Sequence, residues 1–226
     1  MRGTGKQPVA ERTPTRTTRK TKPAPRAAKG TRRRDQEVLD AAAKVFHTRG
    51  YADASVQDIA DELGILKGSL YHYIDSKEDL LFRILDETHD EVQAILDEVA
   101  TMEVTAPLIR LREYIRRQVE YTSRNLAKMA IYYHDVDQLS EERRRDLYRK
   151  RRVHEKFVAD VIAEAQKRGE ASADLDPKIV TNCLFGSMIW VYRWYKPGGK
   201  LRPTELADTC AEFVLRGVIG DTASSR

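Results

Sequence analysis

The sequence predicts an all-α protein in three parts, which are a basic N-terminal segment, a first helical unit and a larger second helical unit. From residue 35 onward, apolar residues recur at helical spacing, and Gly, Pro and Ser stand where helices begin or end. No run of residues alternates as a strand would. The chain has 226 residues, 41% of them hydrophobic, which suffices for one or two domains with a substantial core. The expected segments are residues 1–34, 35–85 and 86–226.

The first 34 residues differ in composition from the rest of the chain. They contain twelve Lys or Arg residues against one acidic residue, Glu11, together with half of the eight prolines and no aromatic residue. Such a segment buries too little apolar surface to offset the entropy lost on ordering, so we expect a disordered basic arm. A flexible cationic arm indicates a polyanionic partner, most simply nucleic acid. A solubilising tail is the alternative.

Helix ends can be placed in the first unit, over residues 35–85. Gly50 suits the left-handed conformation that closes a helix. Ser55 and Asp58 have the spacing of a capping box, and Ser76 is a second candidate N-cap. The expected helices cover residues 35–49, 55–63, 67–73 and 76–100.

The second unit is longer and more apolar. Pro107 suits the first turn of one helix, and Asp176 with Pro177 suits the start of another. The expected helices cover residues 107–123, 125–134, 140–168, 176–195 and 204–219.

The two short helices over 55–63 and 67–73, joined by three residues, have the spacing of a DNA-binding helix-turn-helix. In that motif the first helix braces the second, whose exposed residues enter the major groove. Gly68 costs about 1 kcal/mol relative to alanine in a helix interior, and close approach to DNA would explain it. The residues left exposed on the second helix are Lys67, Gly68, Ser69, Tyr71 and His72.

Two further residues stand at helix N-termini and could bind phosphate. Lys77 lies in a first turn, where the helix dipole disfavours a cation unless an anion is bound there. A phosphate on the N–H groups of residues 76–78 would make this a site; otherwise Lys77 points into solvent. Ser55 could do the same, or serve only as a cap.

The segment DIADELGILKGSLYHYI at residues 58–74, followed by SKEDL at residues 76–80, resembles the N-terminal domain of TetR-type bacterial transcription repressors. The resemblance covers about residues 35–85 and implies a DNA-binding domain there, with a ligand-binding and dimerisation domain over 86–226. Leu66 departs from the family pattern, because a Ser or Thr commonly caps the recognition helix at this position.

The resemblance also implies roles for individual residues. Tyr71 and Lys77 would contact phosphates. Residues 35–80 contain ten Asp or Glu against four Lys or Arg, so long-range attraction to DNA would come largely from the arm. The residues expected to approach base edges or the backbone are Lys67, Gly68, Ser69 and His72.

The predicted helix over 176–195 is apolar on nearly every side and must be covered all round. With the helix over 204–219 it would form a four-helix homodimer interface, as in the TetR-type family; a monomeric core is the alternative. A dimer would place two reading helices about 34–36 Å apart, which matches a palindromic operator. The expected interface residues are Phe185, Met188, Ile189, Trp190 and Phe213.

The resemblance implies a ligand cavity with large apolar walls and a few hydroxyls, which suits an elongated, mostly apolar effector. Ordinary core packing is the alternative for these residues. The helix over 140–168 is rich in arginine, which binds phosphate bidentately, although a solvated basic face is the simpler interpretation. The candidate ligand-binding residues are Tyr121, Met129, Tyr132, Tyr133, His134, Arg145, Arg149 and Arg152.

The stretch WVYRWYKPGG at residues 190–199 resembles TetR-type repressors of steroid and fatty-acid catabolism, whose inducers are acyl-coenzyme A thioesters. The expected function is therefore a homodimeric repressor that an effector, with acyl-CoA as the leading hypothesis, releases from its operator. A repressor of a drug-efflux gene and a nonspecific architectural DNA-binding protein are the alternatives.

Other classes of function lack support in the sequence. No nucleophile, zinc-protease or nucleotide-binding fingerprint is found, so we expect neither an enzyme nor a cofactor. The histidines lack metal-ligand spacing. The longest uncharged run, residues 179–192, is too short to span a bilayer, and no signal peptide is recognisable. We therefore expect a cytoplasmic protein without a membrane partner.

Overall fold

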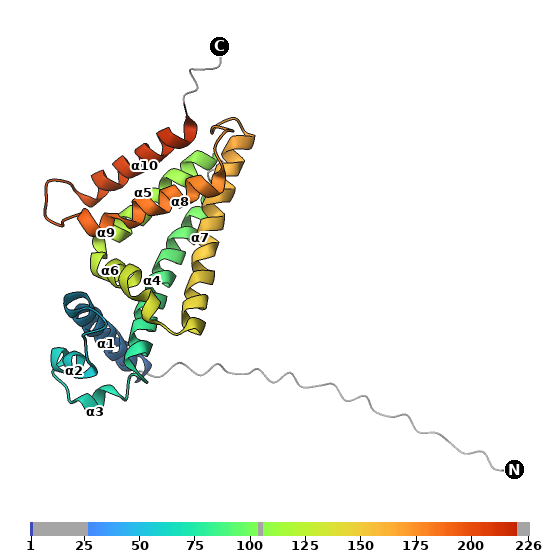
Figure 1. Cartoon of the computed structure of the whole chain (residues 1–226). Coiled ribbons are helices and arrows are strands. Elements are labelled where there is room, and N and C mark those ends of the chain that lie inside the picture. Colours follow the sequence, from blue (N-terminus) through green and yellow to red (C-terminus); the bar gives the residue numbers. More distant parts are fainter. Residues whose placement is uncertain (2–26, 104–105, 221–226) are drawn as a thin grey trace.

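The protein is described by a computed structural model that covers Met1 and residues 27–103 and 106–220 (Figure 1). Within these ranges every regular element is helical, which confirms the predicted fold class. The elements are α1 (Ala27–Arg49), α2 (Val56–Leu63), α3 (Lys67–Leu70), α4 (Lys77–Ala100), α5 (Pro107–Arg124), α6 (Leu126–Asp135), the 3-10 turn η1 (Val136–Gln138), α7 (Glu141–Lys167), α8 (Pro177–Ile189), α9 (Val191–Trp194) and α10 (Pro203–Ile219).

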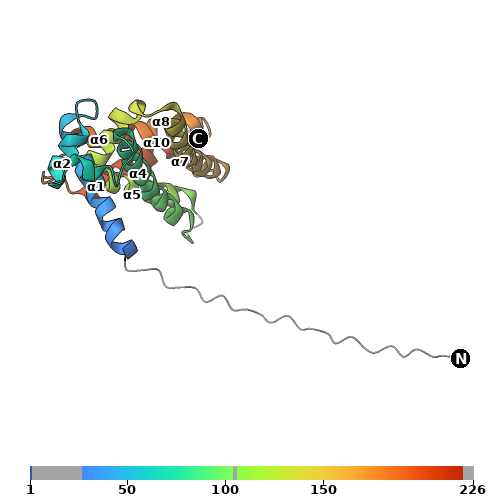
Figure 2. The same ribbon diagram turned by 90° about the horizontal axis from the view of Figure 1, so that it is seen from below.

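Helix α1 begins earlier than composition indicates. Residues 27–34, assigned to the arm, form its first turns, which project from the body of the molecule in Figure 2. Arg33 Nε and Arg34 Nη1 lie 3.2 Å and 2.7 Å from the two carboxylate oxygens of Glu37. Spacings of four and three residues let these ions pair along a helix, which a count of charges overlooks. The rest of the expected arm, residues 2–26, lies outside the described residues.

Four expected end signals of the first unit are confirmed: Gly50, Ser55, Gly64 and Ser76. Gly50 has φ +82°, and the left-handed Gly64 closes α2 at φ +66°. Ser55 and Asp58 form a reciprocal capping box, and the Ser76 hydroxyl accepts the N–H of Asp79 at 3.0 Å. These ends depend on local chemistry, and for that reason the sequence alone places them.

Two helices are shorter than periodicity predicts. The segment expected as one helix over 176–195 divides into α8 and α9 at Trp190, where the N–H of Arg193 bonds to the carbonyl of Trp190. Helix α3 ends at Leu70, and the N–H of Tyr73 bonds to the Leu70 carbonyl. Both bonds span three residues instead of four, which interrupts the regular α-helical pattern at these points.

Two hydrophobic cores hold the helices together. The first core contains residues of α1, α2, α3 and α4, together with Ile131 and Tyr132 of α6 and Leu147 of α7. The second joins α5, the C-terminal half of α7, α8 and α10. The boundary expected after residue 85 falls inside α4, which continues to Ala100. The first unit therefore shares its core with helices of the second.

Figure 1 shows how this arrangement separates the two ends of the molecule. Helices α2 and α3 lie at one end, α10 lies at the other, and α4 and α7 run between them. Of the helices in the described ranges, none is both long enough and apolar enough to cross a membrane.

Candidate nucleic-acid interface and effector cavity

Helix α3 is anchored by one residue and presents the others outward. Leu70 is fully buried in the first core. Of the residues around α3 that are predicted to meet DNA, Ser69 is half-buried, whereas Lys67, Gly68, Tyr71 and His72 are exposed.

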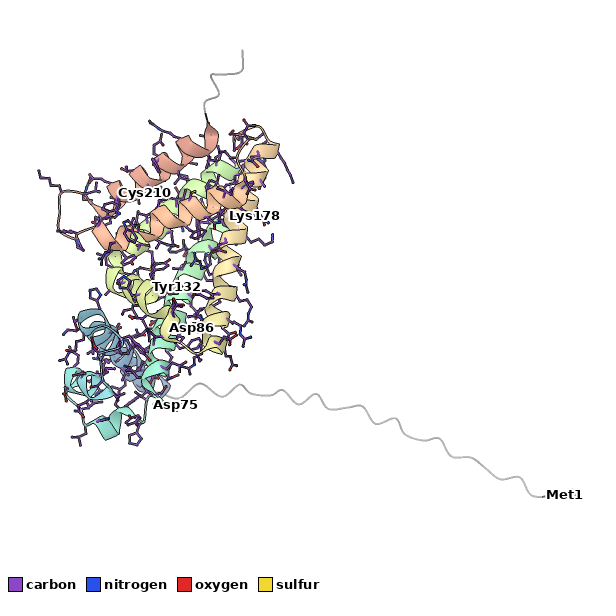
Figure 3. The ribbon with its side chains drawn as sticks, in the orientation of Figure 1. Met1, Asp75, Asp86, Tyr132, Lys178 and Cys210 are labelled. Carbon is purple, nitrogen blue, oxygen red and sulfur yellow. The ribbon has the colours of Figure 1, made fainter. Side chains whose placement is uncertain are left out.

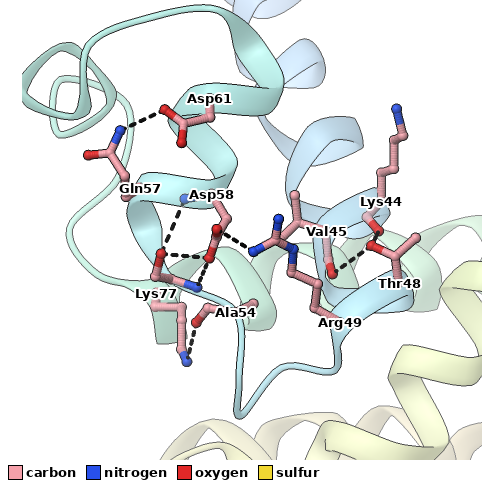
Figure 4. Close-up of polar contacts among 10 residues, drawn as sticks. Lys44, Val45, Thr48, Arg49, Ala54, Gln57, Asp58, Asp61 and Lys77 are labelled. Atoms are coloured by element: carbon pink, nitrogen blue, oxygen red, sulfur yellow. Dashed lines mark hydrogen bonds and ion pairs between the residues drawn. The ribbon is translucent and has the colours of Figure 1, made fainter.

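Lys77 is placed differently from the expectation (Figure 4). Its ammonium Nζ donates to the carbonyl oxygens of Tyr51 at 2.8 Å and Ala54 at 2.9 Å, and it lies 4.3 Å from the centroid of the Tyr51 ring. Carbonyls that no helix satisfies attract a cation, and the long lysine stem reaches them across the start of α4. Lys77 therefore fastens the loop between α1 and α2. Its assignment as a phosphate contact stays a prediction.

Ser55 acts as a cap. Its hydroxyl donates to Asp58 Oδ2 at 2.6 Å and accepts the N–H of Asp58 at 3.2 Å. The Ser55 backbone N–H also donates to Asp58 Oδ2, at 2.8 Å. The two bonds that Ser55 donates lower the pKa of the Asp58 carboxyl, which also pairs with Arg49 at 2.5 Å. Because the hydroxyl hydrogen is already donated to Asp58, the capping interpretation of Ser55 describes this arrangement better than phosphate binding does.

A cavity lies between five helices of the larger unit. Residues of α4, α5, α6, α7 and α8 line it, and its free volume is about 50 Å³. Small-molecule sites typically measure about 300–1,000 Å³, so a ligand much larger than water would have to move its walls. The lining residues are Thr88, His89, Val92, Tyr114, Gln118, Thr122, Met129, Tyr132, Tyr133, Arg151, His154, Phe185, Met188 and Ile189.

Two buried histidines give the apolar cavity a polar side. His89 Nε2 lies 2.7 Å from the Tyr132 hydroxyl, and His154 Nδ1 lies 3.2 Å from the Tyr114 hydroxyl. Burial is the main reason why the pKa of each histidine is lowered to about 4, and for His89 the neighbouring His154 contributes to this shift. Both imidazoles are therefore neutral at pH 7, so each carries one N–H and one acceptor nitrogen.

Two polar atoms of the cavity have no hydrogen-bond partner among the described residues: Gln118 Oε1 and His154 Nε2. Gln118 is 7% exposed and His154 is 3% exposed. If the Tyr114 hydroxyl donates to Nδ1, the His154 hydrogen lies on Nε2. The cavity then offers one donor and one acceptor, and an unpartnered buried polar group is costly until something fills that role.

The expected ligand-binding residues divide into two groups. Met129, Tyr132 and Tyr133 line the cavity. Tyr121 instead donates to the Glu91 carboxylate, and the exposed His134 has its Nε2 3.0 Å from the Tyr192 hydroxyl.

The arginines of α7 also divide into residues that line the cavity and residues that do not. Arg145 and Arg149 are exposed and pair with Glu141 and Asp146 on their own helix, and Arg152 is exposed as well. None of these three lines the cavity; the neighbouring Arg151 does. Successive residues of a helix point about 100° apart, so the basic run marks the helix but not the residue that faces inward.

The expected dimer residues also separate by helix face. Phe185, Met188 and Ile189 line the cavity. Their assignment to the dimer interface stays a prediction. Trp190 is 57% exposed and Phe213 is 72% exposed. Together with Ile179 and Trp194 they form an outward apolar face of α8, α9 and α10, which we call the α8–α10 face.

Sequence reasoning missed the polar side of the cavity. His89, Gln118 and His154 are separated by long stretches of sequence and follow no motif. A weak signal was available, since each stands within a helical apolar stripe where a polar residue needs a partner.

An exposed recognition helix, joined through a shared core to a cavity with polar groups, defines a ligand-responsive DNA-binding regulator. The family model described as bacterial regulatory proteins, tetR family, matches residues 38–84. The model described as tetracyclin repressor-like, C-terminal domain, matches residues 105–218. The chain therefore belongs to the tetR family of bacterial regulatory proteins.

Individual relatives agree with this assignment. The HTH-type transcriptional repressor KstR2 of Mycolicibacterium smegmatis is 33% identical over 191 residues, which cover 82% of this chain and 90% of that protein. The structure of the ketosteroid transcriptional regulator KstR2 of Mycobacterium tuberculosis has a TM-score of 0.78 at 30% identity, covering 83% of this chain and 96% of that one. The structure of AibR in complex with isovaleryl coenzyme A and operator DNA has a TM-score of 0.72 at 26% identity, covering 82% and 98%.

Proposed function

We propose that this protein is a homodimeric repressor that an acyl-CoA thioester releases from a palindromic operator. The observation that supports this most is the position of Tyr132, which lines the cavity and also belongs to the first core. That core holds α1, α2, α3 and the start of α4 together, and we call these helices the DNA-binding head. Figure 3 places it on α6, between that head and the far end of the molecule.

The chemistry of the cavity favours an acyl group. Its walls are mainly aromatic and aliphatic, and the few polar atoms on them can bind a carbonyl or hydroxyl oxygen. Arg151 lines the cavity and is partly exposed to solvent, and its Nε donates to Glu155 at 2.9 Å. A phosphate group of coenzyme A would be recognised at that position. The AibR complex with isovaleryl coenzyme A provides a precedent among the relatives.

The small volume of the cavity would couple ligand binding to the position of α3. An acyl chain can enter only if the walls move apart, and α6 carries Tyr132 and Ile131, which pack in the core with α1 and α4. Displacement of α6 would therefore shift the head that carries α3. The operator affinity can change by no more than the ligand's difference in affinity for the two arrangements.

The α8–α10 face supports a dimer. Trp190, Trp194 and Phe213 are large aromatic residues that expose about half or more of their surface. An apolar face of this kind marks a protein interface. A second copy on this face would repeat α3 at the spacing of successive major grooves.

The effector is tested by measuring thermal unfolding and operator binding with saturated acyl-CoAs of two to sixteen carbons. Free CoA and the matching fatty acids are the controls. We expect at least one acyl-CoA to raise the free energy of unfolding by RT ln(1 + [L]/Kd), which raises Tm, and to weaken operator binding. Free CoA should do neither. Release by apolar drug-like compounds alone would support the efflux-repressor alternative, and no response to any acyl-CoA would overturn the proposal.

Two neighbouring arginines provide a matched pair of variants. Arg151→Met should weaken acyl-CoA binding about tenfold or more, because hydrogen bonds to charged groups contribute about 1.5–3 kcal/mol. Arg152→Met removes an adjacent charge that lies outside the cavity and should change the affinity little. Equal effects of the two variants would contradict the placement of the phosphates at Arg151.

A further inference from the structure

Leu66 is an apolar residue that the fold leaves in solvent. It exposes 80% of its surface, although its neighbours Ile65 and Leu70 pack into the first core. Its place in the turn before α3 puts it on the surface that also exposes Lys67. Core packing therefore does not account for a leucine at this position.

Helix capping does not account for it either. Leu66 is the N-cap residue of α3, with extended backbone angles of φ −69° and ψ 142°. Ser, Thr, Asp or Asn at such a position would accept a hydrogen bond from the first turn, which a leucine side chain cannot do. In the part of the chain that the structure describes, no side chain caps this helix.

Gly68 is a second residue at this turn that the protein's own structure does not explain. Its backbone is helical, so no unusual torsion requires glycine. A Cβ built on Gly68 would meet no described atom within 4 Å, so the protein's own packing does not require glycine either. The missing side chain instead leaves the surface beside Leu66 open to an approaching molecule.

We infer that Leu66 reads the operator through the C5-methyl group of a thymine. Residues at the start of a recognition helix reach base edges in the major groove, where the thymine methyl is the apolar group on offer. Leu66 supplies the apolar contact, Gly68 allows close approach, and the exposed Lys67 can hold a flanking phosphate. This inference rests on the DNA-binding function proposed above. It adds to that function the base that one residue, Leu66, recognises.

Deoxyuridine isolates the methyl group, because it differs from thymidine only by the missing C5-methyl. Operators are first enriched from a random duplex library with the full-length protein, and each thymine is then replaced in symmetry-related pairs. We expect one pair of replacements to weaken binding by about fourfold per half-site, the factor for burying one methyl-sized group. Replacements elsewhere should have little effect.

Variants then assign the contact. Leu66→Ala should bind the thymine operator more weakly and no longer distinguish thymine from deoxyuridine at that pair. Leu66→Ser, which can also cap α3, should lose the discrimination in the same way, so any change in helix stability is separated from the contact. Lys67→Ala is the matched control: it should weaken binding to both operators equally and keep the discrimination.

Two outcomes would overturn the inference: a wild-type protein that is insensitive to deoxyuridine at every position, or a Leu66→Ala variant that keeps the wild-type discrimination. Failure to enrich any sequence would instead contradict the operator-binding function itself. The two failures are therefore distinguishable.

Discussion

Lys77 and Tyr71 carry similar expectations from sequence, yet the structure gives their side chains different tasks. Tyr71 is 49% exposed beside α3, where a phosphate can reach it. The Lys77 ammonium is enclosed by the carbonyl oxygens of Tyr51 and Ala54. A residue type and its position on a helix indicate that the ammonium needs a hydrogen-bond acceptor, but they do not distinguish a phosphate from a backbone carbonyl.

The two residues should therefore respond differently to substitution. Lys77→Ala should lower the free energy of unfolding by about 1–3 kcal/mol, because the carbonyls that it satisfies lose their donor. Tyr71→Ala should leave stability nearly unchanged and weaken operator binding. Urea denaturation and operator titration of both variants test this. An unchanged midpoint for Lys77→Ala would show that the loop between α1 and α2 does not depend on it.

At the scale of elements, the sequence predicts helix ends better than helix faces. Ser55, Gly64 and Ser76 place ends through bonds made within a few residues. Helix α8 is apolar nearly all round, so nothing local separates the side with Phe185, which lines the cavity, from the side with Trp190, which is exposed. That choice depends on where α5 and α7 lie, which is a property of the tertiary structure.

The two histidines that face each other from α4 and α7 make stability depend on pH. The pKa of each is about 4 in the folded protein and about 6.5 when unfolded, so below pH 6.5 the unfolded chain takes up protons that the folded protein refuses. Stability is therefore lost as pH falls from 6.5 towards 4. Between pH 7.5 and 5.5 we expect a loss of about 1–1.5 kcal/mol per histidine.

Urea denaturation at these two pH values measures the effect. His154→Gln should remove about half of the pH dependence while keeping a polar side chain in the cavity. Because pH 5.5 lies above the range in which ordinary carboxyls titrate, their contribution is small. Equal pH dependence of the variant and the wild type would mean that His154 is not held neutral by the fold.

At the scale of the whole molecule, the α8–α10 face should determine oligomeric state. Phe213→Glu should give a monomer by analytical ultracentrifugation, since a buried charge without a partner opposes association. The monomer should retain helical circular dichroism and bind the palindrome weakly. Val153→Glu is the matched control, because Val153 is 49% exposed on α7, which is not part of this face. A Phe213→Glu dimer of normal affinity would place the interface elsewhere.

The shared core of head and cavity also constrains how the molecule can change over evolutionary time. Tyr132 and Ile131 support α1 and α4 from the same helix that lines the cavity. A substitution on α6 that enlarges the cavity to admit a bulkier inducer would also weaken the packing that holds the recognition helix in place. Acquiring a new inducer should therefore carry a tendency towards constitutive derepression, which second-site changes in α1 or α4 would have to restore.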